Sequence, residues 1–240
     1  MTVEHGHAPA EVRARFARPA RTGHLRDAVY GGIDGAVTTL AIVAGVAGAG
    51  LPAGVIVALG IANVLADGFS MAAGNFVASR AERDNVRRLR AMERRHVRQY
   101  PEGERLELAE ILAAKGLSGD ALEDALAAIC RSDRLWIDLM LVEEHGVSPL
   151  DVRPLPAALV TFVAFVACGL VPLAPFLAGL PRPLLTSVVA TGLVFLVIGG
   201  LRGRFSLGSS WKTAAETLSI GAIAGLVAWG ASVAVDNLAG

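Results

Sequence analysis

The chain has 240 residues, is 53% hydrophobic and has a mean hydropathy of +0.52, which few soluble domains of this length reach. Its formal net charge at pH 7 is zero, and it has no basic tract with interleaved aromatic residues, which argues against nucleic-acid binding. Most of its 22 acidic and 22 basic side chains lie between residues 80 and 153. The sequence therefore predicts a charged, soluble segment between two membrane-embedded ones.

Five apolar segments follow a polar, arginine-rich tail at residues 1–27, which lacks the apolar core and cleavage site of a secretory signal. A helix needs about 20 apolar residues to cross a bilayer. We therefore expect an all-α membrane protein with five transmembrane helices, of which two lie within 28–80 and three within 154–240, and a soluble insert at 81–153 between the second and third. The expected helices are about 28–50, 52–79, 155–180, 184–201 and 214–235.

Basic residues beside the spans predict the orientation of the chain, because cytoplasmic loops carry an excess of Lys and Arg. One side holds the arginines of the tail and the insert and the basic residues between the last two spans, whereas the other side holds only Arg182. The tail and the insert are thus expected in the cytoplasm and the C-terminus, with Asp236, outside. The composition, rich in Ala, Gly and Arg, suggests a bacterial cytoplasmic membrane. Outside the insert, the basic residues that predict the cytoplasmic side are Arg13, Arg15, Arg18, Arg21, Arg26, Arg202, Arg204 and Lys212.

The insert is predicted to be a small helical unit. Residues 80–99 continue the second span as a charged helix, and Pro101 begins the next helix at 102–115. Ser118 precedes an apolar periodic stretch as an N-cap, and another helix is expected at 133–144.

Polar side chains interrupt the first two spans. Asp34 lies in the first span, with Thr38 one helical turn further on. In the second span, polar and sulfur-containing residues recur at intervals of three and four, which places them on one face of a helix. This polar stripe consists of Asn63, Asp67, Ser70, Met71 and Asn75.

The two aspartates need a partner, because burying a carboxylate in a bilayer costs about 3 kcal/mol or more. No Lys or Arg lies within the spans to pair with them, which leaves a proton or a cation to balance the charge. Burial favours the protonated form and a nearby cation favours the ionised form, so one group can exchange a proton for a metal ion. The alternatives are a protonated aspartate that bonds a neighbouring helix and a Met71 that only packs. A thioether beside carboxylates favours Fe²⁺ over Mg²⁺ or Ca²⁺.

The insert also carries carboxylate, imidazole and thioether groups at helical spacing. Each set can point from one helix face toward a shared centre, and helix bundles bind Fe and Mn with carboxylates and imidazole. A solvated surface is the default explanation for such spacings. The residues are the pair Glu93 and His96, the series Glu104, Glu107 and Glu110, and the group Met140, Glu143 and Glu144.

Three motifs resemble the vacuolar iron transporter family. They are Asp-Gly-Ala-Val-Thr-Thr from residue 34, Ala-Asp-Gly-Phe-Ser-Met-Ala-Ala-Gly-Asn from residue 66, and Pro-Glu-Gly-Glu-Arg-Leu-Glu from residue 101 with a later Met-Leu-Val-Glu-Glu. The resemblance runs from Leu25 to the end of the chain. It implies five-helix protomers that form homodimers with the ion pathway at their interface, and export of Fe²⁺, often also Mn²⁺, from the cytosol in exchange for protons. It also implies that the insert is a cytoplasmic metal-binding domain.

The resemblance also assigns positions. Asp34 and Met71 match the family's pathway aspartate and methionine. His96 and Asn75 stand where glutamate is common, and Leu141 stands where a second methionine is common; Asp67 is a candidate to compensate for Asn75. Imidazole in place of carboxylate favours later transition metals, so Co²⁺ and Zn²⁺ are further candidates at the insert. The insert residues that match ligand positions are Glu93, Glu104, Glu107, Met140 and Glu144.

The sequence therefore predicts a homodimeric metal transporter in a lipid bilayer, without an organic cofactor and not an enzyme. It lacks a P-loop motif, so ATP coupling is not expected. A passive metal channel and a membrane-tethered metal-binding or sensing protein remain alternatives. A di-iron enzyme would need Glu-x-x-His on two helices, and the insert has this motif once, at Glu93 and His96.

Overall fold

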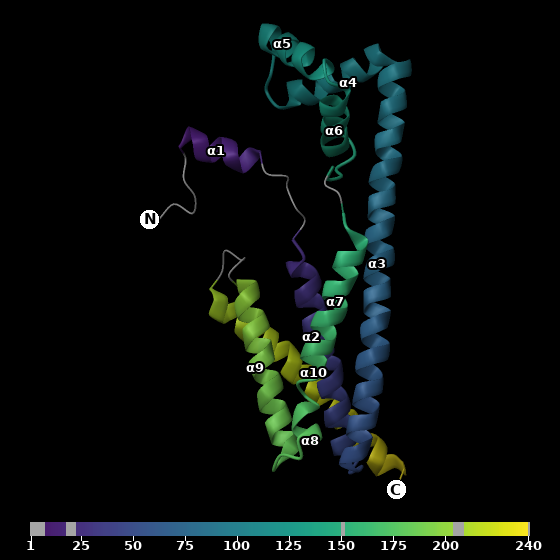
Figure 1. The fold of residues 1–240 in the computed structure, drawn as a ribbon, viewed down its shortest axis with the longest axis vertical. Helices are drawn as coiled ribbons and strands as arrows, with labels where there is room; N and C mark the ends of the chain where they lie inside the picture. Colours follow the sequence, from purple (N-terminus) through teal and green to yellow (C-terminus); the bar gives the residue numbers. More distant parts are fainter. Residues whose placement is uncertain (1–7, 18–22, 150–151, 204–208, 240) are drawn as a thin grey trace. The chain divides into compact units, whose positions relative to one another are not determined.

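The computed structural model describes residues 8–17, 23–149, 152–203 and 209–239, and the chain is helical and without strands over these ranges (Figure 1). The predicted orientation also depends on residues that lie outside this description. They are Arg18, Arg21 and Arg204 and the side chains of Arg15 and Asp236. The helices are α1 (Pro9–Phe16), α2 (Leu25–Gly48), α3 (Ala53–Gln99), α4 (Pro101–Ala114), α5 (Gly119–Cys130), α6 (Asp133–Glu143), α7 (Pro154–Gly169), α8 (Ala174–Leu177), α9 (Pro183–Gly203) and α10 (Ser210–Ala239).

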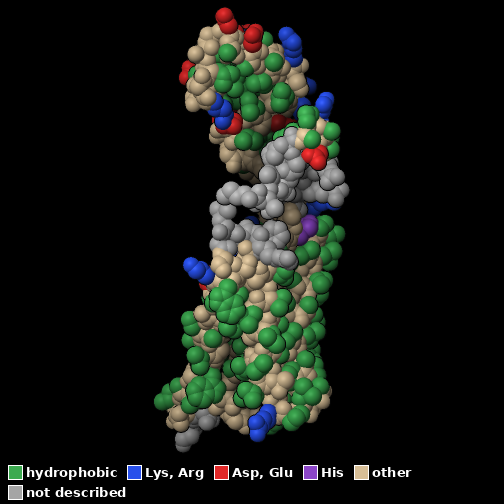
Figure 2. All heavy atoms as spheres, turned by 90° about the vertical axis from the view of Figure 1, so that its left-hand side faces the viewer, with side chains coloured by type: hydrophobic (Ala, Val, Ile, Leu, Met, Phe, Trp, Pro, Cys, Tyr) green, Lys and Arg blue, Asp and Glu red, His purple; other side chains and the backbone are tan. Residues whose placement is uncertain are grey.

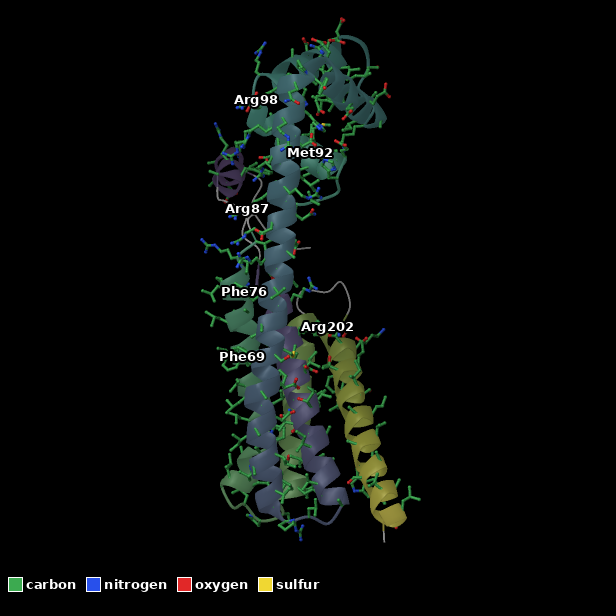
Figure 3. All side chains as sticks on the ribbon, turned by 90° about the vertical axis from the view of Figure 1, so that its right-hand side faces the viewer. Phe69, Phe76, Arg87, Met92, Arg98 and Arg202 are labelled. Atoms are coloured by element: carbon green, nitrogen blue, oxygen red, sulfur yellow. The ribbon has the colours of Figure 1, made fainter. Side chains whose placement is uncertain are left out.

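The chain divides into two compact units. The membrane unit contains residues 23–79 and 154–240, and the insert unit contains residues 80–153 together with 1–22. Helix α3 contributes to both units, because no Gly or Pro interrupts it where its composition changes from apolar to charged. Figure 3 labels Phe69 and Phe76 on its membrane part and Arg87 and Arg98 on its insert part.

Four helices are long and apolar enough to cross a membrane, namely α2, α3, α9 and α10, and the protein is an integral membrane protein. The single helix expected over 155–180 is a wrong prediction, because α7 ends after 16 residues and the four-residue α8 follows a turn. Pro172 lies in that turn and has no N–H with which to continue the helix. The tail also differs from the expectation, since it contains α1 and since α2 begins at Leu25.

Helix α2 is central to the membrane unit, where it packs against α7, α9 and α10. A methyl group at Gly31 would collide with the backbone oxygen of Thr161, and one at Gly35 with the backbone of Phe165. The backbones of α2 and α7 are therefore in direct contact, as small residues allow in lipid, where the hydrophobic effect does not drive helices together. A neighbouring core joins α2, α3 and the turn after α7 and contains Val43, Val46, Ile56, Val64 and Leu173.

The surfaces of the two units differ in composition. On the face shown in Figure 2, hydrophobic side chains cover the membrane unit, whereas acidic and basic side chains gather on the insert unit. Large apolar residues such as Val197 on α9 and Leu226 on α10 are 61% and 69% exposed. Exposed apolar surface of this extent is what lipid tails cover in a membrane.

The insert unit has a core of its own, to which α3, α4 and α6 contribute. The helices expected at 80–99, 102–115 and 133–144 are confirmed to within one residue at their ends. Pro101 is the first residue of α4, where its missing N–H costs nothing, and Ser118 precedes α5 without a side-chain capping bond. The fully buried members of this core include Leu108, Met140 and Leu141.

The contact between α2 and α7 predicts opposite effects for two glycines of α2. Gly35→Ala should destabilise the protein by about 1–3 kcal/mol, because the added methyl forces the helices apart. Gly45→Ala is the matched control, since nothing lies within 4 Å of its added methyl and alanine favours a helix by about 0.5–1 kcal/mol. Thermal unfolding of the purified variants in detergent measures both. Equal melting temperatures for the two variants would contradict the described packing.

Candidate metal sites

A carboxylate occupies a core position on the insert part of α3. Leu89, Glu93 and Val97 recur at intervals of four and are all buried on one face of the helix, and the exposed fraction of Glu93 is 1%. An ionised carboxylate in such a place loses its hydration, which costs several kcal/mol unless another charge and further hydrogen bonds compensate. The neighbourhood of Glu93 is therefore the first place to look for a bound cation.

Two glutamates and two histidines surround this position in pairs. Nε2 of His145 lies 2.9 Å from Oε1 of Glu93, and Nδ1 of His96 lies 3.2 Å from Oε1 of Glu104. Glu104 is also buried, on the face of α4 that carries Leu108. The second oxygen, Oε2, of each glutamate is buried and has no hydrogen-bond partner among the described residues. Two carboxylate oxygens thus have unused acceptor capacity inside the unit.

The potential ligand atoms form two groups that share Glu93. In each group, one nitrogen or oxygen atom from every residue lies within 4.8 Å of the others. Each group combines two carboxylates with an imidazole, which is a donor set that suits divalent transition metals, and all the carboxylates except that of Glu144 are buried. The first group is Glu93, His96 and Glu104, and the second is Glu93, Glu144 and His145.

The structure separates the remaining predicted insert residues. Glu107 lies close enough to Glu104 and Glu144 to act on both electrostatically. Met140 is fully buried in the apolar core of the unit. Glu143 forms an ion pair with Nζ of Lys115 at 2.7 Å, and Glu110 is exposed on α4. Neither of these last two belongs to a metal-ligating group in the described part of the chain.

Two carboxyls of this cluster, those of Glu104 and Glu144, hold protons more tightly than free carboxyls do. Burial, followed by the charges of Glu93 and Glu107, raises the pKa of the Glu104 carboxyl to about 7. Burial likewise raises the pKa of Glu144, against the opposing effect of His145. Below about pH 7, a metal ion that binds the Glu104 carboxylate must therefore displace a proton.

The membrane unit contains the second candidate site. Asp34 on α2 and Asp67 on α3 are both half-buried and lie close enough to interact electrostatically. Neither carboxylate forms an ion pair or a hydrogen bond within the described part of the chain. Asp34 also lines a pocket of about 460 Å³, whose other lining residues are Leu25, Arg26, Val29, Tyr30, Ile33 and Arg202. Two carboxylates that interact on apolar helices, without a basic partner, make this the second place where a cation or a proton could balance negative charge.

The other polar residues of the spans have different environments. The Thr38 hydroxyl donates to the backbone oxygen of Asp34 at 2.9 Å, so it is satisfied within its own helix. Nδ2 of Asn63 is buried without a partner among the described residues. Met71 is half-buried and Ser70 is exposed, both on α3.

Asn75 joins three helices of the membrane unit. Its Nδ2 donates to Oδ1 of Asp27 on α2 at 3.0 Å and to Oγ1 of Thr161 on α7 at 2.7 Å, while the Ser79 hydroxyl donates to its Oδ1 at 3.2 Å. Oδ2 of Asp27 is in turn 3.0 Å from Nδ1 of His24. These partners account for both polar atoms of the Asn75 amide without a metal ion.

Sequence reasoning missed one residue of the polar network around Asn75 and one residue of the insert cluster. Asp27 precedes Asp34 by seven residues, which is two helical turns on the same face, and the spacing was a usable signal. His145 directly follows Glu144, and only the end of α6 brings it to Glu93, so no periodicity could have found it.

The pKa of Glu104 predicts that metal binding at the insert depends on pH. As the pH falls through about 7, protons compete with the metal, and the affinity of the purified full-length protein for Mn²⁺ should fall by up to about tenfold per pH unit. Titrations between about pH 5.5 and pH 8 measure this dependence, which should be shallower in Glu104→Gln. An affinity that stays constant over that range would contradict the prediction.

Known proteins resemble this chain over most of its length. A sequence model described as the VIT family matches residues 25–232. Vacuolar iron transporter 1 of Tulipa gesneriana is 32% identical over 220 residues, which cover 90% of this chain and 89% of the relative. Vacuolar iron transporter 1 of Arabidopsis thaliana is 32% identical over 209 residues, which cover 85% of this chain and 83% of the relative. The vacuolar iron transporter of Plasmodium falciparum is 24% identical over 226 residues, which cover 89% of this chain and 83% of the relative. The chain therefore belongs to the VIT family, whose members are transporters and not enzymes.

Proposed function

We propose that the protein exports Fe²⁺, and also Mn²⁺, from the cytosol in exchange for protons. The observation that carries this proposal is the pair Asp34 and Asp67, two carboxylates on neighbouring apolar helices that interact with each other and have no basic partner among the described residues. Relatives at 32% identity are named vacuolar iron transporters, which supports iron as the cargo.

The exchange follows from the electrostatics of a shared site. Two like charges at close range in a medium of low dielectric constant cannot both persist, so the pair holds either a proton or a cation. A proton that arrives from outside displaces the metal, and the proton is in turn displaced by metal from the cytosol. The thioether of Met71, one turn from Asp67 on α3, adds a soft ligand that suits Fe²⁺.

The insert unit supplies metal to this pathway. Its buried carboxylates and imidazoles would collect ions in the cytosol, and the basic residues that flank the spans favour that side for the insert and for the tail. In this arrangement the cytoplasmic parts of the chain are residues 1–27 and 81–153. The membrane contains five helices, two within 28–80 and three within 154–240, and α7 and α8 together form the third. The C-terminus is then outside, in a bacterial-type cytoplasmic membrane.

We also propose that the working form is a homodimer. The largely exposed apolar surfaces of the membrane helices leave room for a second copy, and Asp34 lines an open pocket on α2. A pathway between two copies would bring two such aspartate pairs together. No covalent step and no organic cofactor enter the mechanism.

The first test is metal uptake by proteoliposomes that contain a metal-sensitive dye. Asp34→Asn and Asp67→Asn keep the size of the side chain but remove the charge, and each should lower the initial rate of anaerobic Fe²⁺ or Mn²⁺ uptake about tenfold or more. Asp84→Asn is the control, because Asp84 lies on the same helix as Asp67 but is exposed beside Arg80, Arg83 and Arg87 at 3.7–3.9 Å. Its rate should equal that of the wild type.

Two outcomes would change the assignment. Uptake that is the same in the wild type and both aspartate variants would remove the pair from the pathway. A wild-type protein that binds metal but moves none would favour the membrane-tethered binding protein over the transporter.

A further inference from the structure

We propose that His145 is a metal ligand of the insert unit and that it adds a second imidazole, besides that of His96, to the potential ligands around the Glu93 carboxylate. The inference rests on the proposed metal-binding role of the insert and specifies which ions it prefers. The ion class is the later divalent metals of the first transition row, Co²⁺, Ni²⁺ and Zn²⁺, in preference to Mn²⁺.

The geometry around His145 matches that of a ligand. Its Nε2 lies 2.9 Å from Oε1 of Glu93 and 3.7 Å from Oε2 of Glu144. Two ligand atoms that each lie about 2.1 Å from one ion stand about 3–4 Å apart, so these distances are those of neighbouring positions in one coordination sphere. The three residues come from α3 and from the end of α6, which brings together groups 52 positions apart in the chain.

Buried oxygen atoms without partners point to a ligand that the protein itself does not provide. Glu93 and Glu104 are 1% and 4% exposed, and Oε2 of each has no hydrogen-bond partner among the described residues. Each of these oxygens belongs to a carboxylate whose Oε1 is next to an imidazole. A histidine that served only as a counterion would leave Oε2 unsatisfied, whereas a cation shared by the carboxylates and the imidazoles would satisfy it.

The backbone holds His145 in place after the helix. Its N–H donates to the oxygen of Met140 at 3.3 Å, and the N–H of Val147 donates to the oxygen of Leu141 at 2.9 Å. Gly146 between them has φ = 63°, in the left-handed region where a side chain would be strained. The ring of His145 is mostly buried, with 16% of its side chain exposed. A ligand fixed in this way is preorganised for binding.

Two nitrogen donors change which ions the centre prefers. The affinity of nitrogen and oxygen sites generally rises from Mn²⁺ through Co²⁺ and Ni²⁺ to Cu²⁺ and is lower again for Zn²⁺. Imidazole suits Zn²⁺ and similar ions, whereas carboxylate suits Mn²⁺. Two imidazole donors, His96 and His145, beside the carboxylates therefore widen the difference in affinity between Co²⁺ or Zn²⁺ and Mn²⁺. A neutral imidazole also adds a ligand without adding negative charge to the site.

The test compares Co²⁺ and Mn²⁺ binding to the purified full-length protein in detergent. His145→Gln should weaken Co²⁺ binding about tenfold or more and change the visible absorption bands of bound Co²⁺, because a nitrogen ligand is lost. Its effect on Mn²⁺ should be less than about threefold, so the ratio of the two affinities falls. His24→Gln is the matched control, because His24 also sits 3.0 Å from a carboxylate, that of Asp27, but belongs to no metal-ligating group in the described ranges.

The outcomes separate this inference from the proposal on which it rests. If His145→Gln weakens Co²⁺ and Mn²⁺ equally, or leaves Co²⁺ affinity and absorption unchanged while Glu93→Gln abolishes them, His145 is a counterion and the inference is wrong. If the wild type binds Co²⁺ with no dependence on Glu93, the metal-binding role of the insert is wrong as well. A melting temperature within the error of the wild type shows that each variant is folded.

Discussion

A carboxylate held away from water requires a proton or a cation, and both units of this protein place carboxylates under that constraint. In the insert, Glu93 and Glu104 occupy core positions on α3 and α4. In the membrane unit, Asp34 and Asp67 interact across two apolar helices. The low dielectric constant of each environment makes charge balance worth more than it is in water. In the proposed mechanism, proton and metal compete for the same oxygens, and the exchange needs no further chemistry.

Close packing provides the rigid frame for these groups. Helix α2 can approach α7 only because Gly31 and Gly35 have no side chain, and this contact fixes the face of α2 that carries Asp34. Asn75 ties α3 to both of these helices through Asp27 and Thr161. In the insert, Glu93 and Glu104 occupy buried positions on the helices α3 and α4, which also contribute to the apolar core of the unit. In both units, apolar packing determines where these carboxylates lie, and their positions support the proposed role in ion binding.

Much of the fold could be predicted from hydropathy and from helix boundary signals, because both depend on local sequence. The insert helices are within one residue of their predicted ends, and the VIT family membership follows from motifs that the sequence shows directly. The break between α7 and α8 was missed because the apolar composition continues across Pro172. His145 was missed because its proximity to Glu93 depends on how α6 packs against α3. Helical spacing grouped Glu143 with Glu144, but the structure pairs Glu143 with Lys115, since spacing does not reveal tertiary partners.

The central claim is that metal and protons exchange at one site, and simultaneous recording of both fluxes tests it most directly. Proteoliposomes would contain a pH-sensitive dye and a metal-sensitive dye, and Fe²⁺ would be added anaerobically without an imposed pH gradient. If the two ions exchange, metal entry drives protons out, so the interior becomes alkaline with the same time course as the metal signal. Metal entry at an unchanged internal pH, measured with an ionophore control that holds the membrane potential at zero, would contradict exchange and support a passive channel.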